Sequence, residues 1–177
     1  RWVRISPWGD TVGVGGILGF LCKTTFTNNG TVNAARDDTY APVSAEAAGF
    51  IRGFVSAANY PQITGEGTGG ARTYSALANG NGGGGVSGGY GGPGGGNGTV
   101  GSLGPSNQGQ GGLTAGSADL TSVVFGGAGG HGGAYNSARY GSNAGDGGGM
   151  LLLWANDFIN NGTVTADGEH GDPVWNY

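Results

Sequence analysis

Residues 15–34 (GGILGFLCKTTFTNNGTVNA) and residues 148–166 (GGMLLLWANDFINNGTVTA) align with each other after a single insertion. Both contain two glycines, an apolar run, a short polar step, a phenylalanine and then Asn-Asn-Gly-Thr-Val-x-Ala. Agreement over this length indicates an internal repeat. The apolar runs Ile17–Cys22 and Met150–Ala155 are short and bounded by residues that break strands, so they predict two buried strands. We expect the two units to pack side by side or in register.

A tight turn is predicted inside each unit, at Asn29-Gly30 and at Asn161-Gly162. Glycine and asparagine readily adopt the positive φ values that such a turn needs. Each unit is therefore expected to be a strand, a turn and a second strand, with Thr-Val continuing beyond the turn.

Between the two units lies a tract, residues 65–149, that holds 34 of the 45 glycines in the 177-residue chain. Its default interpretation is a disordered linker. A linker of this length between two paired units would cost loop-closure entropy without any gain. We therefore expect extended segments with three residues per turn, packed by backbone hydrogen bonds into a polyglycine-II-like bundle. Gly83, Gly84, Gly94 and Gly95 are expected to tolerate no larger side chain, because close backbone approach leaves no room for a Cβ.

Together these patterns predict one all-β domain over residues 1–177, with a first β segment (1–64), the glycine-rich tract (65–149) and a second β segment (150–177). The expected architecture is a β-sandwich or a β-helix-like repeat unit that brackets the polyglycine-II-like bundle. No significant helix is expected, because each interior glycine costs a helix roughly 1 kcal/mol.

Composition excludes several classes of protein. Seven Lys or Arg stand against eleven Asp or Glu, a mildly acidic balance that argues against nucleic-acid binding. No apolar run is long enough to span a membrane. The single cysteine, Cys22, cannot form an internal disulfide and is interpreted as a small buried hydrophobe. Because the chain begins at Arg1, it is expected to be a processed mature chain or a fragment.

Two motifs match enzyme signatures on paper. Residues 80–85 (GNGGGG) fit a dinucleotide fingerprint, but that motif needs a helix directly after it and more glycine follows. Residues 85–89 (GVSGG) fit a nucleophile elbow without the strand and helix that should flank it. His131 and His170 lack an obvious orienting carboxylate. We therefore predict no enzyme, no catalytic residue and no cofactor; a polysaccharide-degrading β-helix is the third alternative.

The one concentrated acidic cluster is DGEHGD at 167–172, in which Asp167, Glu169 and Asp172 could offer three oxygen ligands. Its spacing fits neither an EF-hand nor the calcium repeat of β-helices. A solvated turn is the favoured interpretation, and no metal site is predicted.

Tryptophans and short apolar pieces lie close to both chain ends. RWVRIS (1–6) alternates like a strand until Pro7, and PVWNY (173–177) is a second short piece. Aromatic side chains of this kind stack on sugar rings or are buried at subunit contacts, and we favour the second interpretation. Strand addition between subunits is therefore expected to use contacts from Trp2, Val3, Ile5, Trp8 and Trp175.

Three Asn-Gly-Thr sequons, at Asn29, Asn97 and Asn161, are candidate glycosylation sites. The alternative is that Asn-Gly serves only as turn chemistry, and both roles are compatible.

The order of glycine cluster, apolar strand and NNGT-V-x-A around ANGNGGGGVSGGYGGPGGG (78–96) resembles glycine-rich proteins of phage tail fibres and bacterial surface appendages. Residues 35–64 depart from that pattern because they contain little glycine. The resemblance implies an extracellular or virion protein with a structural or adhesive role and no cofactor. The predicted function is a structural subunit of an extracellular fibrous appendage, a homo-oligomer or filament built by head-to-tail contacts. The alternative is a tail-fibre adhesin tip whose loops around 60–78 and 134–146 contact a cell-surface glycan or receptor.

Overall fold

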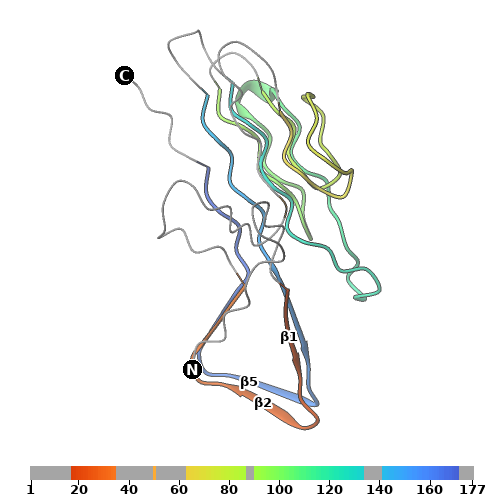
Figure 1. The fold of residues 1–177 in the computed structure, drawn as a ribbon, viewed down its shortest axis with the longest axis vertical. Coiled ribbons are helices and arrows are strands. Elements are labelled where there is room, and N and C mark those ends of the chain that lie inside the picture. Colours follow the sequence, from red (N-terminus) through yellow and green to blue (C-terminus); the bar gives the residue numbers. More distant parts are fainter. Residues whose placement is uncertain (1–16, 35–49, 51–62, 87–89, 134–140, 172–177) are drawn as a thin grey trace.

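The computed structural model describes residues 17–34, 50, 63–86, 90–133 and 141–171 (Figure 1). Each repeat forms three short strands. The strands are β1 (Ile17–Leu21), β2 (Thr25–Asn28) and β3 (Thr31–Asn33) in the first repeat, and β4 (Met150–Trp154), β5 (Asp157–Asn160) and β6 (Thr163–Thr165) in the second. The only helical element among the described residues is a 3₁₀ turn, Pro105–Asn107. The fold is therefore all-β and essentially free of helix, as predicted, whereas neither a sandwich nor a β-helix is shown.

The two repeats pair strand by strand and in register. β1 pairs with β4, β2 with β5 and β3 with β6, each as a two-stranded parallel sheet. Equivalent residues of the repeat lie opposite one another, as in Phe26 opposite Phe158 and Val32 opposite Val164. The expectation that the two units pack in register is confirmed, because the same sequence pattern places the same side chains on the same face in both repeats.

The single insertion between the repeats is accommodated at the corner before β2. Cys22–Thr24 in the first repeat lie opposite only Ala155 and Asn156 in the second. The carbonyl of Thr24 accepts hydrogen bonds from the amides of both Asn156 (2.9 Å) and Asp157 (3.3 Å). One strand thus carries an extra residue without losing register, as in a β-bulge.

The three sheets form the sides of a triangle below the rest of the molecule, and we call this the triangular unit (Figure 1). Its first layer is β1–β3 and its second layer is β4–β6. Phe20, Phe26 and Phe158 lie ring against ring, with centroids 5.0 and 5.9 Å apart in succession. Leu18 is buried, with 6% of its surface exposed. Together with the three rings, it forms a small apolar core with side chains from both layers.

The Asn-Gly turns differ from their prediction. Neither Gly30 nor Gly162 has a positive φ value, and β2 and β3 do not pair with each other. Instead, the side-chain oxygen of Asn28 accepts the amide of Gly30 at 3.0 Å and fixes a corner of the triangle. A corner between strands that pair with another layer does not need the strand reversal of a hairpin, so the positive φ is not required.

The glycine-rich tract forms a bundle of extended segments above the triangular unit in this view (Figure 1). Residues 126–133 are its central segment by hydrogen bonding. Successive amides of this segment donate to three different neighbours. The amides of Gly127, Gly130 and Gly133 donate to segment 90–96, those of Ala128 and His131 to segment 63–66, and those of Gly129 and Gly132 to segment 141–148. A return to the same neighbour every third residue is what an extended backbone with three residues per turn produces. The described part of the tract is thus joined into a bundle by backbone hydrogen bonds between its segments.

Glycine is required where these segments touch. A Cβ on Gly84 would overlap the carbonyl oxygen of Ala76, and one on Gly95 would overlap that of Gly127. A Cβ on Gly83 would lie 2.7 Å from the carbonyl oxygen of Pro93. Gly94 is different, because the closest atom to its Cβ would be the Ser102 hydroxyl at 3.0 Å. Close backbone contact therefore holds at three of the four predicted positions, and Gly94 has more room than expected.

Candidate functional site

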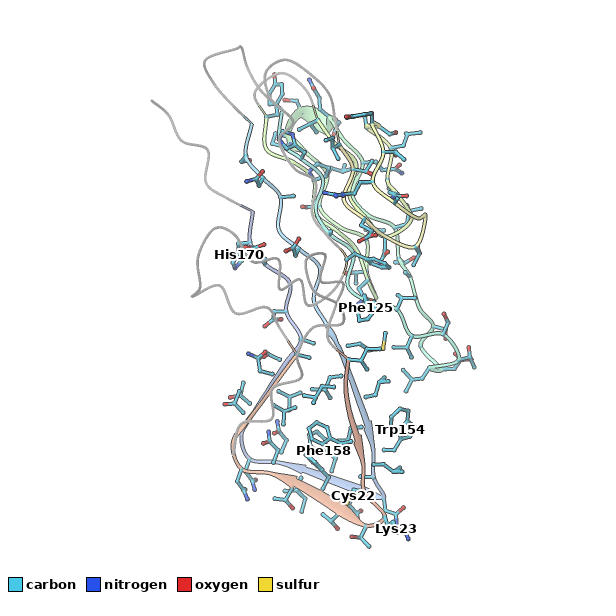
Figure 2. The ribbon with its side chains drawn as sticks, viewed as in Figure 1. Cys22, Lys23, Phe125, Trp154, Phe158 and His170 are labelled. Atoms are coloured by element: carbon cyan, nitrogen blue, oxygen red, sulfur yellow. The ribbon has the colours of Figure 1, made fainter. Side chains whose placement is uncertain are left out.

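The two layers of the triangular unit differ in exposure at equivalent positions. Asn28 is buried, with 6% of its surface exposed, whereas its partner Asn160 is exposed. Phe26 is half-buried, whereas its partner Phe158 is 48% exposed although it points into the triangle (Figure 2). The second layer is thus open to solvent along β5 and β6, whereas in the first sheet Leu21 of the first layer is 86% exposed and its partner Trp154 56%.

Side-chain amides connect the two layers at the corner between the second and third sheets. The Asn28 Nδ2 donates to the Asn160 Oδ1 at 2.8 Å and to the Thr163 carbonyl at 3.1 Å. One position further, the Asn161 Nδ2 donates to the Asn29 Oδ1 at 2.9 Å. Stacked asparagine ladders of this kind are typical of parallel, in-register strands. Of these residues, the sequence predicts a role only for Asn29 and Asn161, as turn formers and sequons, and the doubled Asn-Asn is the signal for the ladder.

The three sequon asparagines are all exposed, but they differ in their partners. Asn29 and Asn161 bond to each other through their side chains, with the Asn161 Nδ2 as the donor, so a glycan on that nitrogen would compete with the ladder at this edge. Asn97 lies in a surface bend of the bundle, and only its backbone is hydrogen-bonded to other described residues. Of the three, Asn97 is the geometrically most accessible acceptor.

A polar groove lies between three segments of the bundle and the segment that follows β6. It is lined by parts of residues 91–102, 126–130, 142–148 and 166–171, and most of its surface is backbone and small polar side chains. Glu169 holds one wall in place, because its amide donates to the Asp146 carbonyl at 2.9 Å and its carboxylate accepts the Asp146 amide at 3.3 Å.

In the acidic cluster at 167–172, one residue, Glu169, takes part in the packing of this groove wall. Glu169 faces the buried Asp146 segment, whereas Asp167 and His170 are exposed, with His170 at the edge of the bundle (Figure 2). Asp172 lies outside the described residues. Across residues 17–34, 50, 63–86, 90–133 and 141–171, no three His, Cys, Asp or Glu side chains gather as metal ligands.

The sequence that matches a dinucleotide fingerprint is a tight turn followed by extended backbone. Asn79 and Gly82 exchange backbone hydrogen bonds of 2.9 and 3.0 Å, and Gly80 has a φ of 60°. Residues 83–86 are then extended and buried in the bundle. A phosphate-binding helix N-terminus is therefore missing at this position. The serine of the elbow-like motif, Ser87, lies outside the described residues.

His131 is the most unusual titratable group of the bundle. It is 5% exposed, and its Nε2 has no hydrogen-bond partner. Burial lowers the pKa of its imidazole below the ordinary value of 6.5. A neutral histidine here packs among glycines and is inaccessible to a substrate.

A second titratable group stabilises a projecting loop. Hydrogen bonds from Ser117 and then Thr121 lower the pKa of Asp119 to about 2. The same bonds hold Leu120 at a φ of 61° with 75% of its surface exposed. The ionised carboxylate therefore orders a loop that presents one apolar side chain to solvent.

The predicted assembly contacts, Trp2, Val3, Ile5, Trp8 and Trp175, lie outside the described residues. Cys22 is half-buried and donates to the Thr25 carbonyl, so it is less buried than predicted (Figure 2). Within the described ranges, no helix has the length and apolar character to cross a membrane. Comparison with protein families, with curated proteins and with solved structures found no match to this chain.

Proposed function

We propose that this chain is a structural subunit of an extracellular fibrous appendage, either a filament or a phage tail fibre, and that copies assemble head to tail. The observation that carries the proposal is the pairing of the two repeats, layer on layer, beside a bundle stabilised by its own backbone. We interpret the bundle as polyglycine-II-like and the triangular unit as two turns of a β-helix-like repeat.

The chemistry of the chain supports a mechanical role. Its amides and carbonyls bond to one another across many segments, so the bundle is held by backbone hydrogen bonds instead of a large apolar core. The tract from 73 to 118 carries no charge, and close-packed glycine segments leave little side-chain chemistry for catalysis. A rigid element that depends on backbone geometry suits a fibre.

Electron microscopy of the purified chain in negative stain tests this function. We expect regular fibres with a constant axial repeat whose number per field increases with protein concentration. A compact particle that remains monomeric at high concentration would overturn the proposal.

The second candidate is a glycan- or receptor-binding tip, and the polar groove of the bundle favours it. Side chains of Asn97, Thr99, Ser102 and Asn143 line that groove and offer hydrogen-bond donors and acceptors to sugar hydroxyls. Binding of the monomer to whole cells or to a glycan array, lost on substitution of groove residues, would favour this candidate over the fibre.

A further inference from the structure

We propose that the open end formed by β4, β5 and β6 binds the β1–β2–β3 layer of a second copy of this chain, so that triangular units stack in parallel register. The proposal rests on the proposed function and deepens it, because it names the surfaces of the head-to-tail contact. The partner is a second copy for the following reason. Within one chain, the β1–β3 layer already pairs with one edge of β4–β6. A second copy offers the same layer to the other edge.

Exposure at the second layer is the first observation. Phe158 is 48% and Val164 38% exposed, although their register partners Phe26 and Val32 are half-buried at the same positions of the first layer. A further layer on top of β5 and β6 would cover these two side chains. Each sheet of the described chain has only two strands, so the outer edge of every strand has no ladder partner among the described residues.

Gly30 and Gly162 give a second, independent observation. A Cβ on Gly162 would overlap the carbonyl oxygen of Gly30 in the layer next to it, so glycine is needed where one layer rests on another. A Cβ on Gly30 would meet nothing within 4 Å, and Gly30 does not have a positive φ. Among the described residues of a single chain, nothing requires glycine at position 30. In a stack, Gly30 would rest on Gly162 of the copy below, and the same steric requirement would apply.

The amide ladder can continue across the same junction. The Nδ2 of Asn160 donates to no described residue, and Asn160 is exposed at the open end. The Oδ1 of Asn28 accepts only the Gly30 amide among the described residues and retains a second lone pair. In a stack, Asn160 of one copy would donate to Asn28 of the next, which repeats the bond that joins the two layers within one chain. Such a contact is heterologous and therefore propagates along one axis.

Disulfide trapping between two single-cysteine variants tests the stack. Both carry Cys22→Ser; one adds Ile159→Cys and the other Thr27→Cys, because these exposed residues are register partners on β5 and β2. Neither variant can form an intramolecular disulfide. We expect rapid formation of a disulfide-linked mixed dimer on oxidation of the mixture, well above the yield with the bundle variant Thr114→Cys as partner. Cross-linking no better than with Thr114→Cys, or a dominant dimer of Ile159→Cys with itself, would overturn the proposal.

Gly30→Ala supplies the matched variant, since alanine fits at position 30 in the isolated chain. We expect unchanged thermal unfolding of the monomer and a fall in the mixed-dimer yield of roughly tenfold or more. A Gly30→Ala chain that cross-links as well as the parent would contradict the stack. If the chain forms fibres but no mixed disulfide, the stacking contact is wrong and the structural function still stands. If the parent chain forms no fibres, the structural function itself is contradicted.

Discussion

The side chain of Asn28 donates a hydrogen bond of 2.8 Å to the side chain of Asn160, which follows it by 132 residues in the sequence. The bond joins equivalent positions of the two repeats and is flanked by two further bonds of Asn28, to the Thr163 carbonyl and from the Gly30 amide. One buried side chain therefore fixes a corner of the triangular unit and the register between its layers.

Replacement of Asn28 by alanine is expected to lower the free energy of unfolding by about 2–3 kcal/mol, because three bonds are lost at a buried site. Asn29→Ala is the matched control. It removes one exposed amide bond and should cost less than about 1 kcal/mol. Chemical denaturation of the two variants measures the difference, and equal costs would show that the buried ladder does not fix the corner.

Gly84 tests the packing of the bundle. Gly84→Ala places a Cβ against the Ala76 carbonyl and is expected to destabilise the protein by about 2 kcal/mol or more. Gly98→Ala, at a surface bend where a Cβ would meet nothing within 4 Å, should change stability by no more than about 0.5 kcal/mol. Thermal melts that do not separate the two variants would mean that the segments around Gly84 are not in contact.

His131 predicts a dependence of stability on pH. Burial lowers its pKa in the folded state, so below pH 6.5 the unfolded chain binds a proton that the folded chain does not. The stability that this group contributes is complete above that pH and is lost as the pH falls, by at most about 1.4 kcal/mol for each pH unit. Urea titrations between pH 7 and pH 5 should show this slope, and His131→Leu should flatten it. The exposed His170→Gln variant, which keeps His131, is the control; a slope that survives in His131→Leu would refute the assignment.

Deletion of residues 1–8 tests the terminal-strand hypothesis, which stays a prediction. If Trp2, Val3, Ile5 and Trp8 supply the assembly contact, the truncated chain should be a folded monomer that forms no fibres. Sedimentation and electron microscopy measure this. Truncated chains that still form fibres and still give the mixed disulfide would assign assembly to the triangular unit in place of the chain ends.

The pairing of the two repeats was predictable because the sequence carries the same apolar and asparagine pattern twice, and equal patterns occupy equal positions in parallel strands. The packing of the glycine tract by its own backbone hydrogen bonds was predictable from the entropy cost of a long linker. The conformation at Gly30 and Gly162 was not, because Asn-Gly favours a hairpin turn locally, whereas the side chain of Asn28 and the neighbouring layer decide the corner. Nor could the sequence distinguish Gly94 from Gly84, since the difference depends on which atom of a distant segment lies opposite.

Residue-resolved amide hydrogen exchange over residues 80–100 is the most direct test of the claim that a backbone-bonded glycine bundle gives this chain its structure. The amides of Gly83, Gly84, Gly85, Gly94 and Gly96 donate bonds of 2.7–3.0 Å to four other segments and to Asn81, and we expect their exchange to be slowed far below random-coil rates. The amide of Gly98 donates to no described residue and should exchange fast in the same sample. Random-coil exchange at all of these glycines would contradict the packed bundle and the structural role that depends on it.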